Sequence, residues 1–292
     1  MIAPALKSMR PHQWVKNLFV AAPLVFARLV GDAHAAARTA AAFGIFCLLS
    51  STVYLVNDLV DLEKDRAHPV KCKRPLASGA LSVRAGRGLA VGLGLTALGG
   101  ALLLGPGIYV AAAGVAYLLL NLAYSFSFKK IAFVDVGCIS AGFLLRVLGG
   151  AVAIPVEPSH WVLACTLLLS ALLGFGKRAH ELRVAGETGK AQRDVLGRYD
   201  LATLQRLMDI LGVLTTVMYL LYTRSPHARS MFHSIALMWT VPFVAFGVFR
   251  FIWIASRKSD AESPTDSMLR DPAFMINLAL YGITVLVLLY RS

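Results

Sequence analysis

Long apolar runs dominate this chain of 292 residues and constrain its fold more than any other feature. Hydrophobic residues make up 57% of the sequence and charged residues only 15%. A soluble domain this apolar would aggregate, whereas a polytopic membrane protein needs such a composition. Many of the runs approach the ~20 apolar residues with which an α-helix crosses a bilayer. Because a segment in lipid must satisfy its backbone hydrogen bonds internally, we expect an all-α polytopic membrane protein.

Nine apolar runs are long enough to predict transmembrane helices. We expect one transmembrane domain over residues 1–292, with the nine helices around a central cavity that opens to the cytoplasm. No cleavable signal peptide is recognisable, so the first helix is expected to act as an uncleaved signal. The predicted spans are 14–30, 34–62, 85–104, 107–126, 131–153, 160–181, 201–223, 231–256 and 272–290.

Basic residues gather in the loops of one side of the predicted bundle. The positive-inside rule places that side, with the N-terminus and the candidate active-site loops, in the cytoplasm of a bacterial-type membrane. An odd helix count then places the C-terminus outside. The net charge of +13 follows from this rule and from phosphate handling, and no soluble domain exists to bind nucleic acid. The basic side carries Lys7, Arg10, Lys16, the segment 64–87, Lys129, Lys130, the segment 177–198, Arg257, Lys258 and Arg270.

The second predicted helix ends in the acidic pattern NDxxDxxxD, over residues 57–65. Asn57, Asp61 and Asp65 are four residues apart, so they share a helix face, and Asp58 falls within the same arc. Carboxylates on one stripe repel each other and oppose the helix macrodipole, so a passive helix end explains them poorly. Mg²⁺ prefers a few carboxylates together with substrate phosphate oxygens. We therefore expect these four side chains to hold Mg²⁺ on a diphosphate, with the three aspartates as the catalytic residues.

A basic segment follows the acidic stripe directly and supplies candidates for phosphate contacts. Lys71, Lys73 and Arg74 precede Pro75 in this segment, although lysines there also satisfy the positive-inside rule. His68 is a candidate substrate contact, while a lone histidine is more often an ordinary hydrogen-bonding residue. Acidic residues followed at once by cations predict a site for a metal-diphosphate at the membrane surface.

Polar residues inside other predicted helices are further candidates, because they are costly in lipid and usually functional. Arg146 needs an anionic ligand, a carbonyl group or an acidic partner in a structural ion pair. Lys16 and Asn17 lie one turn inside the first span and are candidate ligands of a substrate phosphate. Tyr124 and Lys129 end the fourth span, where Lys129 either contacts phosphate or snorkels to the interface.

The end of the sixth span is mostly basic, with Glu181 as the nearby acid. Lys177 and Arg178 there are either an ordinary cytoplasmic flank or contacts for a phosphate. No nucleophile setting and no Gly-rich phosphate loop can be recognised, and the four cysteines lack the spacing of a disulfide or metal site. A chemistry that needs only a metal, cations and positioning fits this sequence better.

The acidic stripe, the nine spans and Tyr124-Ser125 ahead of Lys129 resemble the UbiA superfamily of intramembrane prenyltransferases, over essentially the whole chain. Most members of that superfamily carry a second acidic motif after the sixth helix, with aspartates about one helical turn apart. Residues 176–182 hold that place here, and they are basic. Two acidic motifs suit an allylic diphosphate that is held between two metal clusters. One acidic and one basic site suit a different pair of ligands.

With this basic segment, the chain resembles the decaprenyl-phosphate phosphoribosyltransferase branch of the superfamily. The resemblance implies transfer of 5-phosphoribose from phosphoribosyl pyrophosphate to a polyprenyl phosphate, with release of pyrophosphate. It also implies a place in the synthesis of lipid-linked arabinofuranose for cell-envelope polymers. The strings that carry it are residues 10–17 (RPHQWVKN), 57–75, 142–146 (GFLLR) and 176–182.

The resemblance further implies a role for each group of candidate residues. Mg²⁺ on the acidic stripe and the cations beside it would neutralise the leaving pyrophosphate of the soluble donor. The polyprenyl chain would lie among apolar helices and membrane lipids, with its phosphate in a basic cluster. The donor-binding candidates are Asn57, His68, Lys71, Lys73, Arg74, Tyr124 and Lys129, and the lipid-phosphate candidates are Lys16, Asn17, Arg146, Lys177, Arg178 and Glu181.

Two other functions stay open at the level of sequence. A UbiA-type prenyltransferase would move an isoprenyl group from its diphosphate to an aromatic acceptor, but the second acidic motif for that reaction is missing. A transporter or lipid-binding membrane protein would use intramembrane charges as well, but it would leave the acidic stripe unexplained. A homo-oligomer is compatible with the sequence in each case.

Overall fold

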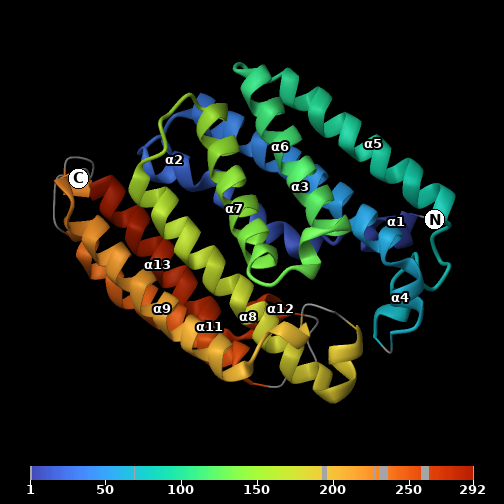
Figure 1. Cartoon of the computed structure of the whole chain (residues 1–292). Helices are drawn as coiled ribbons and strands as arrows, with labels where there is room; N and C mark the ends of the chain where they lie inside the picture. The colour runs from blue at the N-terminus through green and yellow to red at the C-terminus, as the bar shows by residue number, and fades with distance from the viewer. Residues whose placement is uncertain are drawn as a thin grey trace. The chain divides into compact units, whose positions relative to one another are not determined.

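The computed structural model describes residues 2–68, 70–192, 196–226, 228–229, 236–257 and 263–291. All regular elements within these residues are helices (Figure 1), which confirms the predicted all-α class. The chain divides into two compact units, Met1–Lys129 with Ala141–Pro158 and Lys130–Ser140 with Ser159–Ser292. The single domain over residues 1–292 stays a prediction.

Seven helices in the described residues are long and apolar enough to cross a membrane, so the protein is an integral membrane protein. They correspond to predicted spans, although residues 231–235 of the span 231–256 lie outside the described part of the chain. An eighth span results if α12 (Pro264–Arg270) and α13 (Pro272–Arg291), which are bent by 77°, count as one. The seven are α3 (Ala33–Val60), α5 (Val83–Leu102), α6 (Gly107–Phe126), α7 (Val134–Ala153), the segment His160–Arg183 of α8 (His160–Gln192), α9 (Leu201–Arg224) and the segment Ala236–Ala255 with η5 (Ala236–Thr240) and α11 (Val241–Ala255).

The first predicted span, 14–30, takes a different form from the one expected. Pro11–Ala21 is a 3-10 helix (η1), and only Ala22–Phe26 is α-helical (α2). Such a long 3-10 run is uncommon because its hydrogen-bond geometry is poor, so other contacts must support it. Trp14 Nε1 donates to Ser51 Oγ at 3.1 Å, which ties η1 to α3. Hydropathy predicted a spanning α-helix here, but polar contacts with α3 hold a tighter helix.

In the first unit, α3 is the central helix and packs against η1, α5 and α6 (Figure 1). Asp32 caps its N-terminus by accepting from the backbone N–H groups of His34 and Ala35 at 2.8 and 3.1 Å. Close packing also joins η1 to α7, because a Cβ at Gly150 would lie 1.9 Å from the carbonyl oxygen of Val20. Only glycine fits at that contact.

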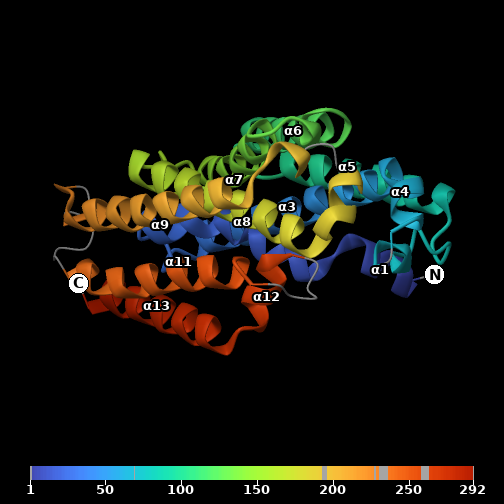
Figure 2. The ribbon, with the colours of Figure 1, turned by 60° about the horizontal axis from the view of Figure 1, so that its bottom comes forward.

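In the second unit, α8 packs along α9, and α11 packs against both α9 and α13 (Figure 2). Leu172, Phe175, Met208 and Phe251 are buried together at the centre of this helix group. Asp200 caps α9, and the hydrogen bond from the Thr203 backbone N–H lowers the pKa of the Asp200 carboxyl. Short helices complete the chain: α1 (Ile2–Met9), α4 (Leu62–Arg66), η2 (Lys71–Lys73), η3 (Phe128–Lys130) and η4 (Leu196–Arg198).

Candidate functional site

The predicted acidic stripe lies where α3 ends and α4 begins. Asp61 separates the two helices, with φ −93° and ψ 12°. The helical backbone bonds nevertheless continue across it: the Asp61 N–H donates to the Asn57 carbonyl at 2.9 Å, and the Asp65 N–H donates to the Asp61 carbonyl at 2.8 Å. The side chains of the stripe therefore keep the helical spacing on which the prediction depends.

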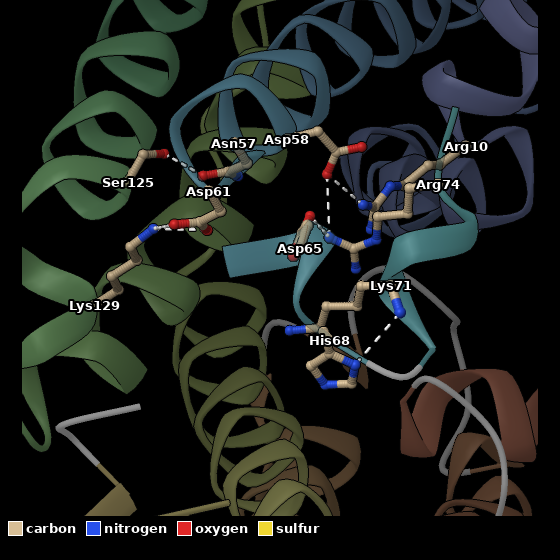
Figure 3. A network of polar contacts seen from close by, with 10 residues as sticks. All are labelled: Arg10, Asn57, Asp58, Asp61, Asp65, His68, Lys71, Arg74, Ser125 and Lys129. Atoms are coloured by element: carbon tan, nitrogen blue, oxygen red, sulfur yellow. Dashed lines mark hydrogen bonds and ion pairs between the residues drawn. The ribbon is translucent and has the colours of Figure 1, made fainter. Parts of the chain in front are cut away.

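The stripe divides into two sets that face different neighbours (Figure 3). Asn57 and Asp61 face the end of α6, where Ser125 Oγ donates to Asn57 Oδ1 at 2.5 Å. Lys129 Nζ lies 2.7 and 2.8 Å from the two carboxylate oxygens of Asp61. Asp58 and Asp65 form the other set, because the step from one to the other along the chain completes nearly two helical turns. With this spacing, the two sets lie at opposite edges of the single arc of about 100° on which the stripe was predicted.

Arg74 bridges the two aspartates of the second set. Its Nη1 lies 3.2 Å from Asp58 Oδ1 and 2.7 Å from Asp65 Oδ2. Leu76, in the turn that follows, is buried with Leu55 of α3 and fixes this turn beside the stripe. Asp58 and Asp65 are only 3% and 4% exposed, so they have lost most of their water. The guanidinium compensates for that loss.

Arg10 also reaches Asp58, and the sequence analysis did not include it among the site residues. Its Nη2 donates to Asp58 Oδ1 at 2.7 Å, and its guanidinium carbon lies 5.1 Å from the centre of the Tyr54 ring. The Arg10 backbone is left-handed, with φ 54° and ψ 60°, at the junction of α1 and η1. This conformation costs a residue other than glycine roughly 1–2 kcal/mol, and such strain is often found at functional sites. The contact joins residues 48 positions apart, so sequence spacing gave no signal for it.

The remaining donor candidates surround this network. His68 and Lys71 lie beside Asp65 in the turn after α4 (Figure 3), where the Lys71 backbone N–H donates to His68 Nδ1 at 3.4 Å. Lys73 is exposed on η2, and Tyr124 is half-buried on α6 next to Ser125. The fold therefore brings the acidic stripe, Arg74 and Lys129 together, and the roles of all these donor-site candidates stay predictions.

A second polar cluster in the first unit surrounds Arg146 on α7. Its Nε donates to Asn17 Oδ1 at 2.7 Å, Nη1 to the Gly142 carbonyl at 2.9 Å and Nη2 to Tyr117 Oη at 2.8 Å. All three acceptors are neutral, and no carboxylate in the described ranges pairs with this guanidinium. The structural ion pair that the sequence left open is therefore absent from the described residues.

The Arg146 cluster also secures η1. Asn17 is fully buried and donates to Ser50 Oγ at 3.2 Å as well as accepting from Arg146. The Tyr117 ring centre lies 4.7 Å from the guanidinium carbon, which adds a cation–π contact. Lys16, the neighbouring candidate on η1, is half-buried. Arg146 thus connects α7 to the segment that carries Arg10 and Lys16.

Arg178, in the second unit, is fully buried and paired with two acids. Its Nε lies 2.6 Å from Asp135 Oδ2, and its Nη1 pairs with Glu181. Asp135 is a further polar residue that the sequence analysis did not single out. A buried guanidinium with two carboxylates has a structural explanation. The predicted lipid-phosphate role of Arg178 and Glu181 stays a prediction that these contacts do not favour, and Lys177 is half-buried on the same helix.

Tyr199 extends the Arg178 network towards η4. Its hydroxyl donates to Asp135 Oδ1 at 2.6 Å and accepts from the Phe133 backbone N–H at 2.7 Å. Burial, together with the hydrogen bond to Asp135, raises the pKa of Tyr199 well above its usual value. The hydroxyl therefore keeps its proton and remains a donor to Asp135 at neutral pH.

The donor set of the acidic stripe can be tested against Mg²⁺. All of its side-chain ligands would be oxygens, which Mg²⁺ prefers. Asp58 and Asp65 lie close enough together that both contact the guanidinium of Arg74. No group of three His, Cys, Asp or Glu side chains in the described residues could hold a metal ion alone. One or two carboxylates with substrate phosphates are a usual Mg²⁺ set, so the stripe fits a metal that is bound together with a diphosphate.

An all-helical membrane protein with carboxylates and arginines at the end of one span has the features of an intramembrane transferase for phosphate-bearing substrates. Residues 17–278 match the model of the UbiA prenyltransferase family. The chain belongs to this family and is an enzyme.

Two curated relatives and one solved structure are similar to most of the chain. The decaprenyl-phosphate phosphoribosyltransferase of Mycobacterium tuberculosis is 35% identical over 256 residues, 85% of this chain and 83% of the relative. The protein of the same name from Corynebacterium glutamicum is 36% identical over 219 residues, 74% and 66% of the two chains. A UbiA homolog from Archaeoglobus fulgidus, solved with GPP and Mg²⁺, matches with a TM-score of 0.70 over 98% of this chain and 97% of that chain. At 16% identity, this last match concerns the fold alone.

Proposed function

We propose that this enzyme transfers 5-phosphoribose from phosphoribosyl pyrophosphate to a decaprenyl-type polyprenyl phosphate and releases pyrophosphate. The observation that carries the proposal is the pairing of Arg178 with Asp135 and Glu181. By its resemblance to the UbiA superfamily, the chain has Arg178 where a second acidic motif is expected, and Arg178 pairs with the acids around it. One candidate metal-diphosphate site remains among the described residues, which suits one diphosphate donor and a monophosphate acceptor. The names of the curated relatives support the same pair of substrates.

The acidic stripe would bind the pyrophosphate of the donor. Asn57, Asp58, Asp61 and Asp65 would hold Mg²⁺, which supplies charge neutralisation to the departing pyrophosphate when it is bound. Arg74, Lys71 and Lys129 would bind the phosphate oxygens directly, with His68, Lys73 and Tyr124 around them. These cations are in place before the reaction, so they stabilise the charge that develops as the bond breaks.

The reaction exchanges one bond at C1 of the ribose for another. The bond from C1 to the pyrophosphate oxygen breaks, and its electron pair leaves with pyrophosphate. The sugar gains oxocarbenium character, and a phosphate oxygen of the polyprenyl phosphate forms the new bond to C1. A phosphate monoester is already anionic near neutral pH, so the acceptor needs no strong general base. This agrees with a site that is composed of cations and carboxylates.

The acceptor phosphate would bind near the polar cluster of the first unit. Arg146 makes hydrogen bonds to neutral groups only, so its positive charge is uncompensated by acids in the described residues. An uncompensated charge within a membrane protein favours a nearby anion. Lys16 and Asn17 adjoin this cluster, and Lys177 in the second unit is a separate candidate. The polyprenyl chain would lie among apolar helices.

Nine membrane segments, with η1 and α2 as the first, would surround a cavity that opens to the cytoplasm. The N-terminus and the acidic stripe would face the cytoplasm of a bacterial-type membrane, because the basic loops lie on that side. Lys258, one of the residues behind this orientation, lies outside the described residues. The product would enter the synthesis of lipid-linked arabinofuranose for cell-envelope polymers.

A transfer assay tests the proposed function. Purified protein would be mixed with Mg²⁺, ribose-labelled phosphoribosyl pyrophosphate and a polyprenyl phosphate, and the lipids would then be extracted. We expect label in the organic phase only when polyprenyl phosphate and Mg²⁺ are both present. Absence of label from the lipid under these conditions, with folded protein, would contradict the proposal.

A further inference from the structure

We propose that Arg10 is an exchangeable counterion of the donor site: it holds Asp58 until a divalent cation takes that carboxylate, and it then binds the diphosphate. The proposal rests on the proposed function, because it requires a metal-diphosphate at the acidic stripe. It adds a donor-binding residue from the junction of α1 and η1, far in sequence from the stripe.

Two positive charges crowd one carboxylate oxygen of Asp58. Arg10 Nη2 and Arg74 Nη1 both reach Asp58 Oδ1, at 2.7 and 3.2 Å. The two guanidiniums repel each other, and the shared carboxylate is what holds them together. A divalent cation on Asp58 would reverse the balance, because it would remove the negative charge and add a further repulsion. Both arginines would then favour a new anion.

Arg10 can change partner without moving its backbone, because backbone contacts hold it on both sides. The Arg10 N–H donates to the Lys7 carbonyl at 3.3 Å, and the Arg10 carbonyl accepts from the Gln13 N–H at 2.9 Å. Ser51 Oγ also donates to the Met9 carbonyl at 3.0 Å, which anchors this junction to α3. The Cα atom is therefore fixed beside Asp58, while the long side chain can pivot past Tyr54. A guanidinium is suited to two parallel bonds with phosphate oxygens.

The exchange has a consequence that a purely structural arginine lacks. A bare metal ion must displace Arg10 from Asp58, so Arg10 opposes binding of the metal alone. The metal-diphosphate gains Arg10 as a ligand, so Arg10 favours binding of the complex. Removal of Arg10 should therefore change the two affinities in opposite directions. An arginine that only maintains the shape of the site would, when removed, weaken both.

The experiment measures binding of two probes to the full-length protein in detergent. Mn²⁺ alone is followed by electron paramagnetic resonance, and Mg²⁺ with inorganic pyrophosphate is followed by calorimetry. We expect Arg10→Gln to bind Mn²⁺ more tightly than wild type and Mg²⁺-pyrophosphate about tenfold more weakly, the loss of one charged hydrogen-bonding partner. Arg10→Lys keeps the charge, so it should bind Mn²⁺ like wild type and Mg²⁺-pyrophosphate with intermediate affinity.

Arg66→Gln is the matched control, because it removes the same charge from a residue that directly follows Asp65 of the stripe. Arg66 is 47% exposed and pairs with the exposed Glu63 at 2.8 Å, so both affinities should equal those of wild type. The proposal is overturned if Arg10→Gln weakens both probes, changes neither, or fails to fold, since an exchangeable arginine cannot be required for folding. If wild type itself does not bind Mg²⁺-pyrophosphate, the proposed function fails, whereas unchanged binding in Arg10→Gln refutes this inference alone.

Discussion

Asn17 accepts a hydrogen bond from Arg146 at 2.7 Å, and this contact joins segments that are 129 residues apart in the chain. It connects the buried face of η1 to α7 within the first unit. Arg10 and Lys16 lie on or beside η1, so the position of these cations depends on the same contact. A side chain that looks like an isolated charge in the sequence therefore supports the segment that supplies cations to the candidate site.

Arg146→Met should lower the stability of the protein. The substitution leaves Asn17 Oδ1 and Tyr117 Oη without this donor, and each buried unsatisfied group costs about 1–3 kcal/mol. Thermal unfolding in detergent should show a lower midpoint, and Arg146→Lys should recover only part of it because lysine lacks the planar fork. An unchanged midpoint with a raised KM for polyprenyl phosphate would instead make Arg146 solely a substrate ligand.

Chelation should abolish transfer and leave the fold intact. EDTA would remove Mg²⁺ from the acidic stripe, but Arg74 and Lys129 already neutralise its carboxylates. We expect no turnover in EDTA, recovery on addition of excess Mg²⁺, and a thermal midpoint that hardly changes. Full activity in EDTA would contradict the metal-diphosphate site. A large fall in the midpoint would show that the protein cations are insufficient to hold the stripe.

Lys129→Gln should reduce transfer by about 100-fold, the usual scale for loss of one preorganised charged contact in an active site. Lys129 pairs with both oxygens of Asp61, and on the proposed function it also neutralises the leaving pyrophosphate. Lys130→Gln is the matched control, because Lys130 is the exposed neighbour of Lys129. Initial rates at saturating substrates measure the effect. Equal rates in the two variants would remove Lys129 from the donor site.

Arg178→Met should strongly destabilise the protein. It would leave Asp135 buried and unpaired, and loss of one partner of a buried ion pair costs about 3–5 kcal/mol. Lys177→Gln, at the half-buried neighbouring position, should have a much smaller effect on the thermal midpoint. If Arg178→Met is as stable as Lys177→Gln but binds polyprenyl phosphate poorly, Arg178 is a lipid-phosphate ligand, as the sequence suggested.

The sequence predicted most of the fold because hydropathy and helix length are local properties. The seven apolar runs between residues 34 and 256 correspond to helices in the described residues that are long enough to span a membrane, whereas the run at 272–290 qualifies only if α12 and α13 count as one span. The run at 14–30 failed as a single α-helix, because Trp14 and Asn17 hold η1 through hydrogen bonds to α3 and α7. The composition shows that this segment is apolar, but it gives no information about those distant partners.

Only the local part of the candidate site was predictable. The spacing of Asp58, Asp61 and Asp65 is local, so the acidic stripe could be found in the sequence. Its partner Arg10 could not, because that contact depends on how η1 returns to α3. Asp135 was missed for a similar reason, since only folding brings it to Arg178.

The central claim is the choice of donor, and a direct comparison of two donor pairs tests it. Purified protein with Mg²⁺ would receive phosphoribosyl pyrophosphate and decaprenyl phosphate together with geranyl diphosphate and a hydroxybenzoate, and the products would be identified by mass spectrometry. We predict that the lipid phosphate gains a phosphoribosyl group, that pyrophosphate is released in equal amount, and that no prenylated aromatic product forms. Prenylated hydroxybenzoate with an unmodified lipid phosphate would contradict the account and would identify an ordinary prenyltransferase.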